Sequence, residues 1–304
     1  MNSLPSERIP MNTNPLSPVT DNDIRTFETD GVVCLRNMID AAWLSELRNG
    51  IDRVIETPTP LHTIQTLAGE DGFFLSDICM AQWDTAVREF VLQGPAAEIA
   101  ARLMRSKQCN FWADTLWVKD AATPKRTRWH QDQPFFWVNG EQMCVIWWPL
   151  DSVSQADCLE LIRGSHQWGK WYAPELSKKG QHLYNSGGRE FDRMPDISAQ
   201  IDDYDVASWA MQPGDCIVFH GSTVHGAPGN TSGHRRRAIS TIWMGDDTRL
   251  GERPSPGRPH FHGHDLTLGD RMDSGYFPRV WPREGTLDAE CFERFNDTEL
   301  RITN

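Results

Sequence analysis

The chain has 304 residues, of which 39% are hydrophobic, and its formal net charge is -12. This length fits one large domain with a single core and long polar loops. The negative charge argues against a nucleic-acid backbone or an anionic membrane surface as a partner. No run of 18 apolar residues and no apolar N-terminal stretch is present, and the seven Cys form no C-x-x-C pair, so we expect a cytoplasmic protein with reduced thiols.

The first third of the chain predicts mainly helices. Residues 1–20 are rich in Ser, Pro and Asn, which predicts a flexible N-terminal arm. Thr20 or Asp21 can cap a short helix that Gly31 would end, and Asp40 can cap a longer amphipathic helix. The predicted helices cover about residues 21–29, 41–57 and two segments within 81–105, with a buried strand at 32–35.

From Gln108 onward the pattern changes to short strands separated by turns. Helices followed by many short strands predict a mainly β fold, such as a double-sheet jelly roll with the helices packed on one sheet. Residues 167–205 interrupt this pattern and predict a lid or binding loop, and the tail after about residue 250 looks irregular. Without an internal repeat, residues 21–304 are expected to form one domain. The predicted strands are 111–119, 129–136, 143–150, 158–163, 216–219 and 236–244.

A metal site is predicted by His130 and Asp132, with His225 as the third ligand. In an extended segment, residues two apart point to the same side, so one imidazole and one carboxylate can share a metal. Two His and one carboxylate with open positions are typical of non-haem Fe(II) oxygenases. An H-x-D pair alone is weak in a chain with ten His, but Arg236 on the following strand and the turn at 213–215 strengthen the interpretation.

The other histidines are weaker ligand candidates. His220 lies near the expected third ligand, but a buried hydrogen-bonding role is favoured for it. His166 follows Gly-Ser and is expected to hold a turn. His260, His262 and His264 alternate, as in a metal-binding tract. They lack a suitable carboxylate partner, and a lid or interface loop is favoured there.

Three segments resemble the phytanoyl-CoA dioxygenase family. They are residues 129–134, 159–166 and 213–240, and the likeness covers roughly residues 20–250 in order. The family belongs to the Fe(II)- and 2-oxoglutarate-dependent oxygenases, which are built on a double-stranded β-helix, a form of jelly roll. The resemblance therefore implies this fold, Fe(II), 2-oxoglutarate and O2, with His130, Asp132 and His225 as the metal ligands.

The resemblance also implies a residue that binds the distal carboxylate of 2-oxoglutarate. Arg236 stands two before Ala238, as in the family pattern, and a guanidinium can bind a carboxylate through two parallel hydrogen bonds. Arg235 and Arg237 compete for this role, but strand alternation sends both to the face opposite Arg236. The family often has a Ser two residues after the distal His, where this chain has Ala227, so one hydrogen bond to the cosubstrate is missing or moved.

Further pocket residues are proposed around the cosubstrate and the substrate. Trp147 matches a family Trp near the cosubstrate, and four weaker candidates are Gln131, Ser222, Thr115 and Lys119. Several Trp surround the His-Asp pair and could accept an apolar ring or, through cation–π contact, a cation. These are Trp112, Trp117, Trp137 and Trp148.

The implied activity is oxidation, by hydroxylation, of an unactivated C–H bond in a small metabolite or natural product, with release of succinate and CO2. Asp132 favours oxygenation, because related halogenases have a small residue in its place. Desaturation, ring closure and endoperoxide formation need the same ligands and stay open. Two alternatives are a cupin-type dioxygenase without 2-oxoglutarate, in which Arg236 has no role, and a non-catalytic jelly-roll binding protein. A homodimer also stays open.

Overall fold

The computed structural model describes residues 11–173, 175–176, 181–182, 191–253, 259–283 and 302–303. Its centre is an eight-stranded antiparallel sheet in the order β1-β12-β7-β14-β4-β3-β2, with β17 also paired to β4. The strands of this large sheet are Val32–Leu35 (β1), Thr63–Ile64 (β2), Phe74–Ile78 (β3), Cys109–Lys119 (β4), Met143–Pro149 (β7), Cys216–His220 (β12), Arg236–Met244 (β14) and Arg279–Trp281 (β17).

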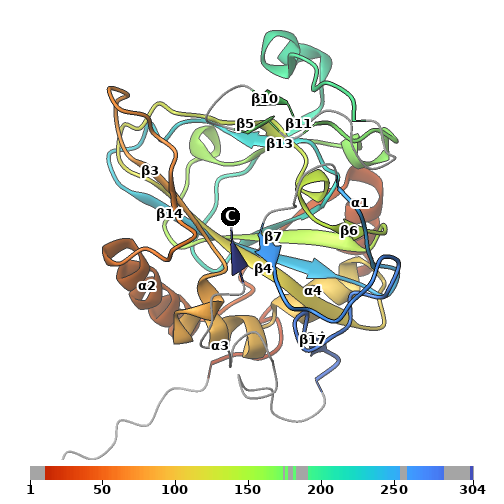
Figure 1. The fold of residues 1–304 in the computed structure, drawn as a ribbon. Coiled ribbons are helices and arrows are strands. Elements are labelled where there is room, and N and C mark those ends of the chain that lie inside the picture. The colour runs from red at the N-terminus through yellow and green to blue at the C-terminus, as the bar shows by residue number, and fades with distance from the viewer. Residues whose placement is uncertain are drawn as a thin grey trace, which may run out of the picture.

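A smaller four-stranded sheet, in the order β11-β8-β13-β5, lies across from the large one (Figure 1). Apolar side chains from both sheets form one buried cluster, in which Leu161 and Ala227 of the small sheet join Trp147 and Ala238 of the large one. The chain thus folds as a jelly roll, which confirms the predicted fold class. The strands of the small sheet are Thr127–His130 (β5), Glu160–Ile162 (β8), Val206–Ala207 (β11) and His225–Ala227 (β13).

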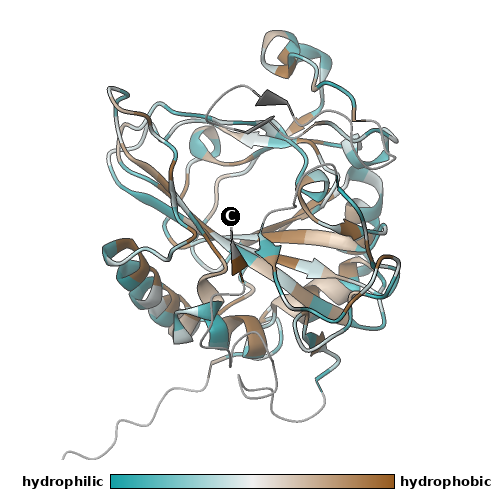
Figure 2. Ribbon diagram, in the orientation of Figure 1, coloured by the Kyte–Doolittle hydropathy of each residue, from teal (hydrophilic) through white to brown (hydrophobic). Residues whose placement is uncertain are grey.

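In the described part of the chain, four α-helices cover the outer face of the large sheet, as predicted. Edge-to-face aromatic contacts connect them to it, with ring centroids 5.3 Å apart for Trp43 and Phe90 and 5.4 Å apart for Phe90 and Trp148. Figure 2 shows hydrophobic residues concentrated on the large sheet and on the sides of the helices that face it. The helices are Asp21–Asp30 (α1), Ala41–Glu56 (α2), Thr85–Gln93 (α3) and Ala96–Leu103 (α4).

The predicted helix ends agree with the structure. Thr20 caps α1 and forms a reciprocal capping box with Asp23, and Asp40 caps α2. Gly31 ends α1 with a φ of 72°, a conformation that other residues rarely adopt. A Cβ there would also lie 2.3 Å from Nδ1 of His166, so only Gly permits this close approach.

The remaining short elements connect the sheets. Among them, β6 pairs with β15, β9 with β10, and β16 with β18. They are Met80–Gln82 (η1), Gln133–Phe135 (η2), Val138–Asn139 (β6), Gln155–Asp157 (η3), Ser165–Gln167 (η4), Glu175–Leu176 (β9), Gln181–His182 (β10), Ile197–Asp203 (η5), Arg249–Leu250 (β15), His260–Phe261 (β16) and Ile302–Thr303 (β18).

Two predictions about the ends of the chain need correction. The arm expected at 1–20 is at most half that length, because Asn12 bonds Asp40 at the start of α2 and accepts a hydrogen bond from Trp43 on its carbonyl. Residues 1–10 lie outside the described part. The tail after residue 250 is not wholly irregular, since β17 extends the large sheet and Phe277 is fully buried in the core. The strands at 63–78 were not predicted.

The strand expected at 129–136 is also shorter. β5 ends at His130, and Asp132 adopts a helical backbone conformation before the turn η2. The amides of Asp132 and Gln133 both donate to the carbonyl of Gly221, at 3.0 and 2.8 Å, and Pro134 at the start of η2 favours a turn over a continued strand. Strand alternation is therefore not what brings Asp132 beside His130.

The long segment at 167–205 lies only partly within the described residues. Its apolar side chains Trp171, Ala173 and Phe191 form a small buried cluster. The amide of Tyr172 donates to the side chain of Gln131, so the segment touches the turn that carries Asp132. Its role as a lid stays a prediction. Within the ranges that the structure describes, no helix has the length and apolar character needed to cross a membrane.

Candidate metal centre

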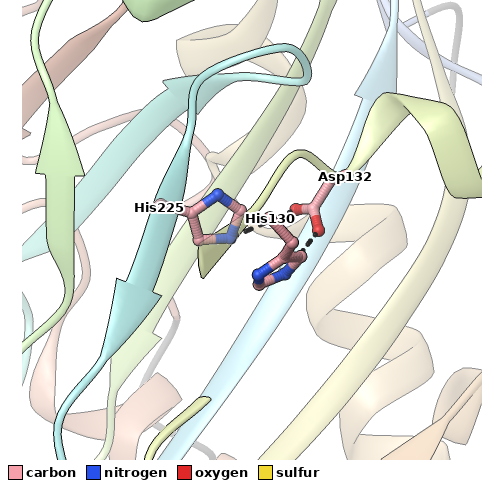
Figure 3. A group of neighbouring side chains, drawn as sticks. All are labelled: His130, Asp132 and His225. Atoms are coloured by element: carbon pink, nitrogen blue, oxygen red, sulfur yellow. Dashed lines mark ion pairs between the residues drawn. The ribbon is translucent and has the colours of Figure 1, made fainter. Parts of the chain in front are cut away.

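Pairing within the small sheet brings the predicted metal ligands together. β13 and β5 are antiparallel neighbours, and their register places His225 opposite His130. The imidazole centroids are 4.2 Å apart, and the Asp132 carboxylate lies 3.3 Å from Nε2 of His130 and 3.8 Å from Nε2 of His225. The candidate ligand atoms all lie within 4.8 Å of one another. Figure 3 shows the three side chains converging from the two segments.

Backbone carbonyls orient both imidazoles. Nδ1 of His130 lies 2.8 Å from the carbonyl of Arg128, and Nδ1 of His225 lies 3.0 Å from the carbonyl of Thr223. Since a carbonyl only accepts, each Nδ1 must carry the hydrogen, which leaves the Nε2 lone pair directed at the shared position. Metal-binding histidines are commonly held in this way.

The charged Asp132 carboxylate and the neutral His225 imidazole suit a cation, which would have to compete with a proton on His130. Burial, together with the neighbouring His130, lowers the pKa of His225 to about 4, so its imidazole is neutral near pH 7. Burial alone would raise the pKa of Asp132, but the two histidines outweigh it and hold the carboxyl below its usual range. Burial lowers the pKa of His130, and the Asp132 carboxylate more than reverses this. A carboxylate between two imidazoles is thus favoured in its charged form.

The site opens toward solvent on one side. The side chains of His130 and Asp132 are 21% and 19% exposed, whereas that of His225 is 7% exposed. A metal ion could therefore enter without unfolding the sheet. In the described part of the chain, this is the one group of three or more His, Cys, Asp or Glu residues close enough to hold a metal ion.

The inner face of β14 carries the second part of the site. Ala238 belongs to the buried cluster between the sheets, whereas Ile239 packs under the helices. Alternation along the strand therefore turns Arg236 and Ser240 toward the interior with Ala238. The register of β14 with β4 and β7 then places Ser240 between Thr115 and Trp147.

The three consecutive arginines have different surroundings. Arg235 pairs with Asp120 at 2.5 Å, and Arg237 pairs with Asp151 at 2.8 Å and with Asp52 at 2.6 Å. Those carboxylates compensate the positive charges of Arg235 and Arg237. Both side chains thus pair with acidic residues on the face of β14 opposite Arg236, as strand alternation predicts.

Arg236 is the buried member of the three. Its exposed fraction is 6%, and its guanidinium donates to the backbone carbonyl of Asp157. Within the described ranges, no carboxylate lies within ion-pair distance of it. Burial lowers the pKa of Arg236, although Cys158 and Asp157 partly oppose this. A buried guanidinium with spare donors and no counter-ion fits an incoming carboxylate, such as one end of 2-oxoglutarate.

Two other pocket predictions lie beside Arg236, and one interior residue was missed. Trp147 and Thr115 both face the interior through their register with Ser240, and Trp147 is 3% exposed. Ser240 itself accepts a hydrogen bond from the indole of Trp117 at 3.2 Å. It could have been found from the sequence, since it stands four residues after Arg236 on one strand and so shares its face.

Gln131 and Ser222 bond to the protein. The Gln131 amide donates to the carbonyls of Lys170 and Ser222 and accepts from the backbone of Tyr172. The Ser222 hydroxyl donates to Gln133 at 2.8 Å. These bonds hold the turn between His130 and η2 against the segment before β13. Direct contact of either side chain with a cosubstrate stays a prediction.

Among the described residues, the other candidate histidines do not join the metal cluster. Nε2 of His220 lies 2.6 Å from the carbonyl of Glu141, and burial together with the nearby His166 lowers the pKa of His220 to about 4. This agrees with the structural role expected for it. The rings of His260 and His262 lie 4.3 Å apart, and His260 also packs edge-on against Trp137 at 4.3 Å.

A jelly roll with a His-Asp-His cluster on its inner face has the features of a non-haem iron oxygenase. A buried arginine with no carboxylate partner among the described residues fits a cosubstrate with a second carboxylate, such as 2-oxoglutarate. Comparison with known proteins agrees with that class.

The chain belongs to the phytanoyl-CoA dioxygenase family, whose match covers residues 27–238. It is therefore an Fe(II)- and 2-oxoglutarate-dependent oxygenase. A protein of Caenorhabditis elegans described as a probable phytanoyl-CoA dioxygenase is 27% identical over 255 residues, which span 73% of this chain and 74% of that protein.

Solved structures of similar fold include two alpha-ketoglutarate-dependent enzymes from nogalamycin biosynthesis. The alpha-ketoglutarate-dependent carbocyclase SnoK from nogalamycin biosynthesis is 22% identical, with a TM-score of 0.67 over 88% of this chain and 99% of that one. The epimerase SnoN, solved with Fe3+, alpha-ketoglutarate and nogalamycin RO, is 16% identical, with a TM-score of 0.67 over 86% and 98%. EctD from S. alaskensis, solved with 2-oxoglutarate and 5-hydroxyectoine, is 17% identical, with a TM-score of 0.62 over 84% and 90%.

Proposed function

We propose that the enzyme hydroxylates an unactivated C–H bond of a small metabolite or natural product, with His130, Asp132 and His225 holding Fe(II) and Arg236 anchoring 2-oxoglutarate. The observation that carries this proposal is the pairing of a complete His-Asp-His cluster with a buried arginine that has no carboxylate partner in the described chain. Iron and 2-oxoglutarate supply the oxidising chemistry when bound, through oxidative decarboxylation of the cosubstrate with O2.

The residues of the chain position the reactants. The Arg128 and Thr223 carbonyls hold the two Nδ1 hydrogens, so both imidazoles present Nε2 to the iron position. Asp132 fills one ligand position, which leaves no room for the halide that halogenases bind in its place. Hydroxylation is therefore favoured over halogenation.

The distal end of the cosubstrate would lie against Arg236. The guanidinium is fixed by the Asp157 carbonyl and surrounded by the buried cluster between the sheets, so water is excluded from the charge contact. A charge-assisted, bidentate contact in such surroundings gives both affinity and a fixed orientation. Trp147 and Thr115 line the same inner face and are proposed to flank the cosubstrate.

A small-molecule substrate is supported by the surroundings of the metal centre. The turn after His130 leads into Phe135, Phe136 and Trp137. The imidazole of His130 lies 6.1 Å from the ring of Phe135 in an edge-on contact. Of the similar structures, SnoK is described as a carbocyclase and SnoN as an epimerase of nogalamycin biosynthesis, and EctD was solved with 5-hydroxyectoine, a small molecule. Hydroxylation is thus the proposal for this chain, with product mass as its test.

The proposal is tested by anaerobic titration of the Fe(II)-loaded protein with 2-oxoglutarate. A visible charge-transfer band is expected to grow with cosubstrate, to be absent in Asp132→Ala and to need far more 2-oxoglutarate in Arg236→Met. Arg235→Met is the matched control, because that guanidinium pairs with Asp120 on the surface. Iron binding without a band would favour a cupin-type dioxygenase, and failure to bind iron would favour a binding protein.

Substrate screening follows by measuring succinate release. A candidate substrate should raise succinate formation above the uncoupled rate and gain the mass of one oxygen atom. A product that instead loses two hydrogens, or keeps the substrate's mass, would replace hydroxylation with desaturation or with an isomerising reaction at the same site.

A further inference from the structure

A second buried basic side chain lies beside Arg236. β4 ends at Lys119, and the register of β14 with β4 pairs Arg236 with Lys119 directly. Paired residues on neighbouring strands point to the same face, so both side chains enter the interior. The exposed fractions are 1% for Lys119 and 6% for Arg236, which means that neither cation is solvated by bulk water.

The contacts of Lys119 leave room for an anion. Its Nζ donates to the carbonyl of Pro228 at 2.8 Å and lies 4.5 Å from the centre of the Phe74 ring. An ammonium group has three donors, and the carbonyl takes one of them. Within the described residues, no carboxylate is paired with this lysine. Lys and Arg are rarely buried without such a partner, and this pair of basic groups has no acidic partner among the described residues.

The carbonyl that holds Lys119 also locates it relative to the metal centre. Pro228 follows Ala227 directly, at the end of β13, the strand that begins with His225. Ala227 belongs to the buried cluster between the sheets, so the carbonyl that accepts from Nζ lies next to this interior. Lys119 thus extends from β4 to the end of the strand that carries one of the candidate metal ligands.

We infer that Lys119 is a second anchor for the distal carboxylate of 2-oxoglutarate, donating from Nζ beside Arg236. The inference rests on the proposed binding of that carboxylate by Arg236. A carboxylate offers about four lone-pair directions, so it can accept from a guanidinium and an ammonium together. Two converging cations would also favour the dicarboxylate 2-oxoglutarate over 2-oxo acids without a second carboxylate.

The protonation of Lys119 on cosubstrate binding offers a second test of the inference. Burial and the nearby Arg236 and Arg126 lower the pKa of Lys119 to about 6, so the amine is mostly neutral at about pH 7.5 in the free protein. These two guanidiniums are the charged groups that act on it, since β3 presents the Phe74 ring and the segment after β13 a backbone carbonyl. An arriving carboxylate favours the ammonium form, so binding should take up a proton.

The experiment is anaerobic calorimetric titration of the Fe(II)-loaded protein with two ligands, 2-oxoglutarate and 2-oxopentanoate, which lacks the distal carboxylate. In Lys119→Met, the Kd for 2-oxoglutarate should rise roughly 10- to 100-fold, and the Kd for 2-oxopentanoate should stay near the wild-type value. Lys119→Arg should recover part of the affinity. Lys107→Met removes an exposed lysine and is the matched control.

Proton uptake is measured by repeating the titration in two buffers of different ionisation enthalpy. Wild type should take up a larger fraction of a proton than Lys119→Met at about pH 7.5, because only wild type has the shifted amine. If Lys119→Met weakens both ligands equally, or neither, the lysine is a brace for the Pro228 carbonyl and the inference is wrong.

The failure of this inference can be told apart from failure of the proposed function. If wild type binds 2-oxoglutarate and Arg236→Met weakens it while Lys119→Met does not, only the role of Lys119 is refuted. If wild type does not bind 2-oxoglutarate, or Arg236→Met binds it as wild type does, the proposed anchoring itself is refuted and the lysine inference falls with it.

Discussion

Neighbouring arginines on β14 should separate cosubstrate affinity from stability. We predict that Arg236→Met loses 2-oxoglutarate affinity with little change in the free energy of unfolding, whereas Arg237→Met does the reverse. The reason is the difference in counter-ions. Arg236 is 6% exposed and has no carboxylate partner among the described residues, while Arg237 pairs with both Asp151 and Asp52.

The magnitudes follow from these surroundings. In Arg236→Met, the loss of the hydrogen bond to Asp157 costs about 1 to 3 kcal/mol, and removal of an uncompensated buried cation offsets a similar amount. In Arg237→Met, two carboxylates lose their partner, and the Asp151 side chain is 17% exposed. That loss should cost about 2 to 3 kcal/mol and lower Tm by roughly 5 °C.

The affinity for 2-oxoglutarate should fall more in Arg236→Met than in Arg237→Met, the opposite of the order for stability. Truncating one partner of a buried charge pair costs about 2 to 5 kcal/mol, so the Kd for 2-oxoglutarate should rise on the order of 100-fold in Arg236→Met. In Arg237→Met it should stay within about threefold of wild type, because that side chain lies on the opposite face of β14.

Two measurements on each variant decide the matter: urea unfolding of the metal-free protein, and anaerobic titration of the Fe(II)-loaded protein with 2-oxoglutarate. The reasoning is refuted if Arg236→Met is destabilised as much as Arg237→Met and still binds 2-oxoglutarate normally. The buried guanidinium would then be a structural brace for the segment around Asp157.

Three further predictions concern the metal centre and its support. Asp132→Ala should abolish iron-dependent succinate release without loss of the folded circular-dichroism spectrum, and Asp202→Ala, an exposed carboxylate, should leave the activity unchanged. The folded-state pKa of His220 is about 4, below the ordinary value of 6.5, so the neutral imidazole contributes its full stability above pH 6.5 and loses it as the pH falls toward 4. This loss should be on the order of 3 kcal/mol in the free energy of unfolding, and urea titrations across this pH range should show a smaller loss in His220→Gln. Gln131→Ala should weaken Fe(II) binding about 10-fold by competition with a chelator, and unchanged affinity would show that its three hydrogen bonds do not hold the ligand turn.

Local signals made the helical part of the fold predictable. A capping residue, an amphipathic repeat and a terminating Gly or Pro act within a few residues, so α1 and α2 begin and end where the sequence places them. The short strands at 63–78 were missed because β3 is stabilised by pairing with β4, a partner far along the chain. Such long-range pairing leaves little trace in the local pattern.

The sequence predicted which residues lie together in the candidate site, but not the backbone conformation that brings them together. His130, Asp132 and His225 lie together as the motif implied, yet the expected extended run through Asp132 is wrong. The turn that replaces it depends on the Gly221 carbonyl, which accepts the amides of Asp132 and Gln133 and belongs to a segment about ninety residues away. No pattern near the motif could have shown that contact.

The order of the three arginines is itself explained by the strand. Alternation on β14 sends Arg236 inward, and the residues on either side must then face outward. The outward pair is held by carboxylates on three separate segments, at Asp120, Asp151 and Asp52. These outer ion pairs fix the start of the strand, which would otherwise be free to relax and let the buried cation reach water. Holding Arg236 in the interior without a carboxylate of its own would therefore depend on its neighbours, which fits the proposal that this single position among three similar residues anchors 2-oxoglutarate.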